Sequence, residues 1–255
     1  IPKHSRLPGV APVETPDWIV SPDDLNLQLQ YRDALFDALC DHVLGLLDAG
    51  DAPAHELLDI LLAYLAERNG WDVDASRVLR PDGRRVAINR SEPMLTIGRL
   101  VSEDFCILSK PREQSEYVLV AAALCFPAGW SLADKMGRPM TEIHGPVPYY
   151  GRDLAKRVNR IFDGIRPEQI LLRFNWSLPT SPELHAPPGG PATSKMPKGE
   201  PVHFLCVERQ TLRRLPRTNA VAFGIRTTMT PIVNLRPEEA KSLLFELEKQ
   251  DDEMT

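Results

Sequence analysis

Apolar side chains recur along the first part of the chain at the three- and four-residue spacing of amphipathic helices. Such stripes run from Leu25 to Leu47 and from Ala54 to Arg68, and Gly50–Pro53 separates them. The pattern predicts two helices that each bury one face. Residues 1–20 carry four prolines and are expected to form an extended arm, with Trp18 as its anchor into the body.

Short apolar runs replace the helical spacing after about residue 100. The run from Val118 to Phe126 is apolar throughout, which indicates a strand buried on both faces, and Asp104–Leu108 is expected to pair with it as a hairpin. Further elements are predicted as extended pieces within Val78–Asn89, helices at Leu95–Val101 and Tyr150–Ile165, and strands at Ile170–Trp176, Val202–Leu212 and Ala220–Thr230. This order predicts an α+β fold: an antiparallel sheet with flanking helices behind an N-terminal helical segment.

His144 follows a segment with little conformational freedom. Ser131–Asp134 has the form of a capping box at a helix start, and Pro139 can open a second short turn over Met140–Ile143. After the histidine, two prolines within Gly145–Pro148 fix two φ angles. An imidazole on this backbone can aim a ring nitrogen at a fixed point. A histidine at a helix end is also commonly a partner of the helix dipole or a hydrogen-bonded core residue, so both roles stay open.

The predicted strand Ala220–Thr230 has two unlike faces. Under the period-two rule Ala222 and Gly224 point to one side, while Phe223 and Ile225 point to the other. The face of small side chains could accommodate either a flat group or a closely packed helix, and the residues alone favour the helix.

Glu208 lies on an otherwise apolar predicted strand, on the face that it shares with Phe204 and Cys206. A buried carboxylate must find a partner or take up a proton. One hypothesis is a structural ion pair with Arg209, Arg213 or Arg226, and the other is a functional role in a pocket.

Composition narrows the function classes. The 255 residues carry a formal charge of −5, which argues against a dedicated nucleic-acid-binding protein. The four cysteines are scattered singly, so reduced thiols in a cytoplasmic protein are expected, and no apolar stretch reaches the ~18 residues of a membrane span. Ser181–Pro201 holds six prolines and three glycines, which predicts a long loop in which His185 is exposed to solvent.

Several segments resemble one known family. Cys125–Gly137, with the sequence CFPAGWSLADKMG, and Ile143–Pro148, with the sequence IHGPVP, are similar to the signature of the haem-dependent oxidative N-demethylase family. Other segments that look like the same family are Leu100–Leu108, Arg173–Leu178, Val207–Thr218 and Phe223–Thr227. Together they span roughly Asp17 to Pro231, in the order that the family has.

The resemblance implies a PAS-like haem-binding domain over residues 76–255, packed with a helical segment over residues 1–75. It implies haem b, with His144 as the iron ligand and a small-molecule substrate such as an amine. Gly224 would lie against the porphyrin plane, and Arg226, Arg173 and Lys135 are candidates to bind the haem propionates. Glu208 would lie near the iron as the catalytic residue, where it could orient a cationic amine or relay protons.

The resemblance leaves the chemistry open. Where the family tends to read F-T-I-R-T-Y, this chain has Phe223-Gly-Ile-Arg-Thr-Thr228, so a hydroxyl and a phenol are missing beside the expected haem, and we expect a larger pocket. Three hypotheses remain: a monooxygenase, a haem enzyme of rearrangement or dehydration, and a haem-based gas or redox sensor. No G-x-G-x-x-G motif for a flavin or nicotinamide follows a strand, so electrons are expected from a separate reductase as redox partner.

Overall fold

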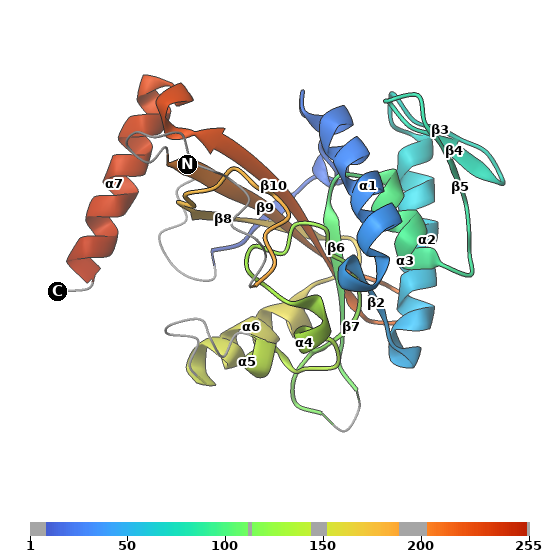
Figure 1. Ribbon diagram of the computed structural model, residues 1–255. Coiled ribbons are helices and arrows are strands. Elements are labelled where there is room, and N and C mark those ends of the chain that lie inside the picture. Colours follow the sequence, from blue (N-terminus) through green and yellow to red (C-terminus); the bar gives the residue numbers. More distant parts are fainter. Residues whose placement is uncertain (1–8, 112–113, 144–151, 189–202, 254–255) are drawn as a thin grey trace.

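The chain folds around one large antiparallel sheet with helices on both sides (Figure 1). The structure is a computed structural model that describes residues 9–111, 114–143, 152–188 and 203–253, without the side chains of 152–155 and 249–253. The arrangement confirms the predicted α+β class. The PAS-like assignment and the domain boundary near residue 75 stay predictions.

The seven strands of the main sheet have the order β1-β8-β9-β10-β6-β7-β2, and β3, β4 and β5 form a small second sheet. The strands are β1 (Ala11–Val13), β2 (Leu44–Leu46), β3 (Asp72–Val73), β4 (Arg77–Leu79), β5 (Arg85–Ala87), β6 (Asp104–Ser109), β7 (Val118–Ala123), β8 (Ile170–Ser177), β9 (Phe204–Arg214) and β10 (Val221–Pro231). The helices are α1 (Leu25–Val43), α2 (Asp48–Ala66), α3 (Pro93–Leu100), α4 (Leu132–Lys135), α5 (Met140–Ile143), α6 (Arg152–Gly164) and α7 (Pro237–Glu253), with short 3-10 turns at Thr15–Asp17 and Ile232–Asn234.

Helices α1, α2 and α3 cover one face of the sheet, which we call the α1–α3 face (Figure 1). Ala222 of β10 and Phe105 of β6 belong to the same buried apolar cluster as Leu29, Leu57 and Ile97 of these helices. Burial of this cluster contributes about 25 cal/mol per Å² of apolar surface removed from water, so it is a main source of stability.

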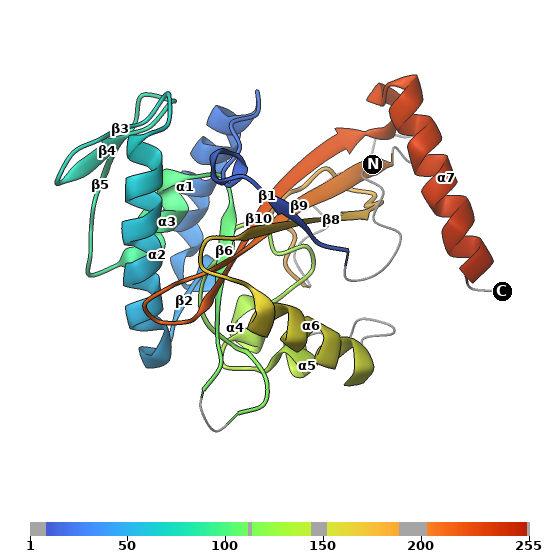
Figure 2. The same ribbon diagram turned by 180° about the vertical axis from the view of Figure 1, so that it is seen from behind.

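Helices α4, α5 and α6 pack on the opposite face, which we call the α4–α6 face (Figure 2). Here Val221 and Leu212 of the sheet share a second buried cluster with Leu132 of α4, Ile143 of α5 and Phe162 of α6. Since successive residues of a strand point to opposite faces, odd-numbered residues of β10 belong to this side.

The predicted hairpin of β6 and β7 is confirmed, and all six residues of β7 are buried. The first helix is shorter than predicted, because Leu44–Leu46 leaves the helix and pairs with β7. Helix α2 then begins at Asp48, so Gly50 lies inside it and does not separate two helices. A Cβ atom at Gly50 would lie 2.3 Å from the Val120 carbonyl oxygen, which explains why the helix can approach β7 only with glycine there.

The N-terminal arm is fastened to the body as expected. Trp18 is fully buried and stacks edge-on against Tyr64 and Phe105, and the Arg213 guanidinium lies 4.4 Å from its ring centroid. The Tyr64 hydroxyl donates a hydrogen bond of 2.9 Å to the Pro16 carbonyl oxygen. These contacts place the start of α1 beside the sheet.

A buried ion pair joins α1 to the main sheet. The Arg32 guanidinium contacts the Asp104 carboxylate, and both side chains have no exposure to solvent. Asp104 also accepts hydrogen bonds from the backbone N–H groups of Cys125 and Phe126, at 2.7 and 2.9 Å. The carboxylate therefore has several donors, as a buried charge requires.

Helix α7 stands beyond the far ends of β9 and β10, away from the other helices (Figures 1 and 2). It is absent from the sequence-based predictions. None of the helices in the described part of the chain has the length and apolar character needed to cross a membrane.

Candidate functional site

The sheet separates the predicted site residues into two groups. Gly224 and Arg226 lie on the α1–α3 face, since they alternate with Phe223 and Ile225 along β10. Glu208 of β9 pairs with Thr227, so it lies on the α4–α6 face together with Arg173 of β8, which pairs with Gln210. A planar group on one face of the sheet cannot contact both groups.

The α1–α3 face is closely packed at Gly224. A Cβ atom there would lie 2.8 Å from the Thr211 hydroxyl oxygen and 3.0 Å from a ring carbon of Phe105. The neighbours at Gly224 are thus side chains of the adjacent strands β9 and β6 rather than the closely packed helix that the sequence favoured, and the described residues leave no space for a porphyrin plane there.

Arg226 is engaged with helix α1. Its guanidinium lies 2.5 Å from a carboxylate oxygen of Asp24 and donates to the Thr227 carbonyl oxygen, while its side chain is 2 % exposed. Burial lowers the pKa of Arg226, and the Asp24 carboxylate opposes that shift. The structural role of Arg226 is thus explained by Asp24, and a contact with a haem propionate stays a prediction.

The departures from the family pattern also fall on the α1–α3 face. Gly224 stands where the family tends to have a threonine hydroxyl, and Thr228 stands where it tends to have a tyrosine phenol. Both are even-numbered residues of β10, so they point to the α1–α3 face and not toward α4–α6. Their side chains do not contribute to the opposite face. The expectation of a larger pocket beside Glu208 therefore has no support from these two positions.

Polar side chains cross the α4–α6 face in two rows. Arg173 pairs with Gln210, and Asn175 pairs with Glu208 one step further along the same two strands. Phe223 and Ile225 of β10 continue this face as half-buried apolar side chains. The face therefore combines an apolar surface with a carboxylate, two amides and a guanidinium.

Glu208 is held by two neutral amides. Its Oε2 atom accepts hydrogen bonds from Asn175 Nδ2 at 3.1 Å and from Gln210 Nε2 at 2.7 Å. Within the described part of the chain Glu208 takes part in no ion pair, so the expected arginine partner is not found there. Amide donors orient a carboxylate without neutralising its charge, and this charge can bind a cation.

Lys135 lies at a hollow of about 230 Å³ formed by the turn before α4, by α4 itself and by the end of α5. Its ammonium donates a hydrogen bond of 2.8 Å to the Ile143 carbonyl oxygen and lies 5.4 Å from the Trp130 ring centroid. Lys135 thus satisfies a carbonyl at the end of α5. His144, the next residue, lies outside the described residues, and its role as an iron ligand stays a prediction.

His185 is not exposed as predicted. The side chain is half-buried, and its Nδ1 atom lies 2.7 Å from the Cys125 carbonyl oxygen. Because a carbonyl oxygen only accepts, Nδ1 must carry the hydrogen. This contact fixes the segment around residue 185 against the turn that follows β7.

The buried cysteines are neutral thiols. Burial raises the pKa of Cys106 and Cys125 to about 12 and that of Cys206 to about 11, and the Glu208 charge adds to the effect at Cys206. All four cysteines are free, and Cys40 is exposed. Since the thiolate is the form that binds metal, none of the three buried thiols is prepared to do so.

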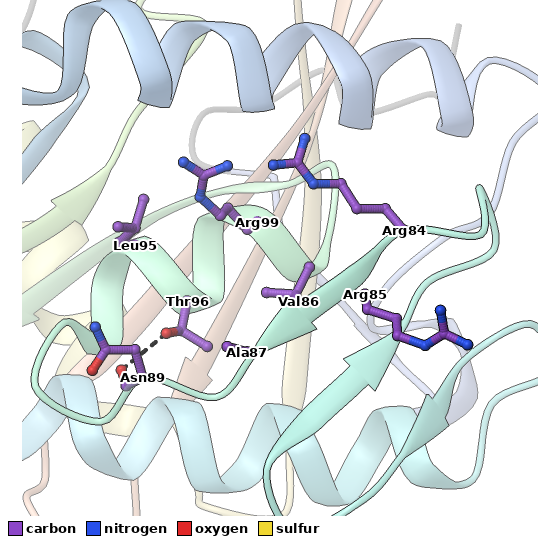
Figure 3. A pocket seen from close by; sticks show the side chains of 8 residues that line it. All are labelled: Arg84, Arg85, Val86, Ala87, Asn89, Leu95, Thr96 and Arg99. Atoms are coloured by element: carbon purple, nitrogen blue, oxygen red, sulfur yellow. Dashed lines mark hydrogen bonds between the residues drawn. The ribbon is translucent and has the colours of Figure 1, made fainter.

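A second hollow, of about 260 Å³, lies between β5 and α3 and carries three arginines (Figure 3). Arg84 and Arg99 reach its rim, but both pair with Asp33, at 2.9 and 3.1 Å. Thr96 donates its hydroxyl hydrogen to the Asn89 carbonyl oxygen at 3.0 Å. None of the predicted site residues lines this hollow.

Asn175 and Gln210 were not predicted as site residues. Both lie in segments that resemble the family, and both have the same strand parity as Arg173 and Glu208. That shared parity is the signal in the sequence that points to them.

The chain matches the model of a known family. The model of a family described as haem-dependent oxidative N-demethylase, alpha subunit-like, matches residues 9–255. The match extends over nearly the whole chain, including every predicted site residue.

Proposed function

The chain belongs to this haem-dependent oxidative N-demethylase, alpha subunit-like family, and from that premise we propose that it uses haem b to oxidise a protonated small amine on the α4–α6 face. The observation that carries the substrate class is Glu208, a half-buried carboxylate held by two neutral amides rather than by a cation.

The residues on the α4–α6 face fit a haem better than those on the opposite face. Phe223 and Ile225 supply half-buried apolar surface for a porphyrin, and Arg173 on the same face could bind a propionate. His144 would hold the iron, because it follows Ile143, which is buried in the cluster on this face. When bound, the haem would supply the oxidative chemistry, with electrons from a separate reductase.

Glu208 would bind the ammonium group through a charge-assisted hydrogen bond. Asn175 and Gln210 restrict the carboxylate to one orientation, since both donate to the same oxygen. The carboxylate can then accept a proton from the ammonium nitrogen and leave the neutral amine for oxidation of the adjacent carbon. Restricting the substrate in this way lowers the entropic part of the barrier.

Haem-loaded protein with a chemical reductant, oxygen and a panel of N-methylated amines tests the proposal. We expect release of formaldehyde, and we expect Glu208→Gln to lower kcat/KM by about 10- to 100-fold while the haem content is unchanged, because a charged hydrogen bond is lost. Glu67→Gln, which removes an exposed carboxylate just after α2, among the helices of the opposite face, serves as the matched control. Formaldehyde release that is the same in Glu208→Gln and in the wild type would contradict the role of Glu208.

The same assay separates the other haem functions. Haem binding with substrate turnover but no oxygen consumption would indicate a rearrangement or dehydration. Tight binding of carbon monoxide or oxygen without turnover of any amine would indicate a sensor.

A further inference from the structure

The amide oxygen of Gln210 is a buried hydrogen-bond acceptor whose direction is fixed by the hydrogen bond that the same amide donates. Its Nε2 group donates to the Glu208 carboxylate, and because that carboxylate only accepts, the amide cannot be turned over. The amide oxygen Oε1 therefore points away from Glu208. The side chain is 7 % exposed, and Oε1 is buried without a hydrogen-bond partner among the described residues.

Glu208 has a second acceptor beside this oxygen. Its hydrogen bonds to other described residues both end on Oε2, so among these residues Oε1 remains for another donor. Residues 208 and 210 are two positions apart on one strand and share its face, about 7 Å apart along the strand. The two side chains are joined by the 2.7 Å hydrogen bond from Gln210 Nε2 to Glu208 Oε2, so their remaining oxygens, one charged and one neutral, flank that bond as two acceptors for a small cation with several N–H groups.

We propose that Gln210 is a specificity-determining residue whose Oε1 accepts an N–H hydrogen from the amine that Glu208 binds, a role that rests on the proposed function. A buried amide oxygen without a donor is costly, so a ligand that supplies an N–H group is favoured over one that does not. Among cations of equal charge, the site therefore prefers those that carry N–H groups. Quaternary ammonium ions satisfy Glu208 only by charge and leave Oε1 of Gln210 unpaired.

Asn175 has a different role. It is exposed and donates to Glu208 Oε2 only, so it positions the carboxylate without contributing an acceptor to the cation. Replacement of Asn175 should weaken the binding of all cations alike. Replacement of Gln210 should change the preference between them.

The test uses the haem-loaded protein and two probes, methylammonium and tetramethylammonium, with dissociation constants from calorimetry. We expect Gln210→Met to weaken methylammonium binding about tenfold or more relative to tetramethylammonium, as loss of a hydrogen bond to a charged donor does. Gln28→Met is the matched control, because Gln28 is also buried and also donates Nε2 to a carboxylate, that of Asp24, but lies at α1. It should leave the ratio of the two constants unchanged.

A ratio in Gln210→Met equal to that of the wild type, with native circular dichroism, would overturn the role of Gln210. If this variant does not fold, Gln210→Asn keeps an uncharged amide on a side chain one methylene shorter, whose oxygen no longer reaches the same position, and the preference for methylammonium should fall. A wild-type preference in that variant would also overturn the role. Wild-type protein that takes up haem but binds neither probe would refute the amine site itself.

Discussion

Substitution of Gly224 by alanine tests which face of the sheet holds the cofactor. The new methyl group would lie 2.8 Å from the Thr211 hydroxyl oxygen and 3.0 Å from a ring carbon of Phe105. Both neighbours are buried on the α1–α3 face, with exposures of 1 % and 0 %. Neither can move into solvent, so the packing of β6, β9 and β10 must adjust.

The expected loss of stability follows from two opposing contributions. Overpacking by one methyl group costs about 1–3 kcal/mol. Alanine in place of glycine within a strand recovers about 0.5–1 kcal/mol of backbone entropy, because the φ angle of Gly224 is not in the left-handed region. The free energy of unfolding should therefore fall by about 1 kcal/mol, within a range of about 0–2.5 kcal/mol, and the central value corresponds to a Tm lower by about 2–4 °C for a chain of this size.

Thermal unfolding of the haem-free protein measures this loss, and titration with haem, followed by Soret absorbance, measures the affinity in the same variant. We expect a lower Tm with an unchanged haem dissociation constant, because the cofactor is proposed to lie on the α4–α6 face. A variant with wild-type Tm and haem affinity reduced tenfold or more would refute this placement, because the methyl group would then be in contact with the porphyrin.

Three further predictions follow from buried polar groups. Arg226→Met should lower the free energy of unfolding by about 1–3 kcal/mol in urea denaturation, since it removes the ion pair with Asp24 and leaves that carboxylate only its hydrogen bond from Gln28, yet haem content should not change; loss of haem with wild-type stability would restore the propionate role. Burial raises the pKa of Glu103 above its usual 4.5, so the folded state binds the carboxyl proton more tightly than the unfolded state, and the free energy of unfolding falls as the pH rises above 4.5. The variant Glu103→Gln has no proton to lose and should not show this fall. Parallel pH profiles of the free energy of unfolding in the two proteins would contradict the prediction. In the native protein a thiol reagent should modify Cys40 alone, with the three buried cysteines reacting only after unfolding, and rapid modification of all four thiols would show that the burial is wrong.

The strands of the sheet could be predicted because their signals are local. The apolar run of β7 and the alternation along β10 are visible in the sequence, and both strands form as expected. Strand β2 could not be predicted in this way, because Leu44–Leu46 continues the helical stripe of α1. Only its pairing with Ala121–Ala123, which are distant in sequence, makes it a strand.

Helix α7 could have been predicted. Pro237 at its first position and the acidic residues Glu238 and Glu239 in its first turn are common signals of a helix start.

The candidate site could be predicted only in part. The period-two rule puts Gly224 and Arg226 on one face of β10 and groups Glu208 with Cys206 on one face of β9, but it does not say which faces of the two strands coincide or which helices cover them. Helices α1–α3 occupy the face of small side chains, so the residues expected to contact haem there are packed in the core. The amide partners of Glu208 depend on the pairing of β8 with β9, which no local pattern reveals.

The absorption spectrum of the haem-loaded protein and of two histidine variants tests the central claim most directly. His144→Ala should abolish or shift the Soret band, because His144 is proposed as the iron ligand on the α4–α6 face. His185→Ala, which removes a half-buried histidine that bonds to the Cys125 carbonyl oxygen, is the matched control and should keep the wild-type band. An unchanged Soret band in His144→Ala would contradict the account.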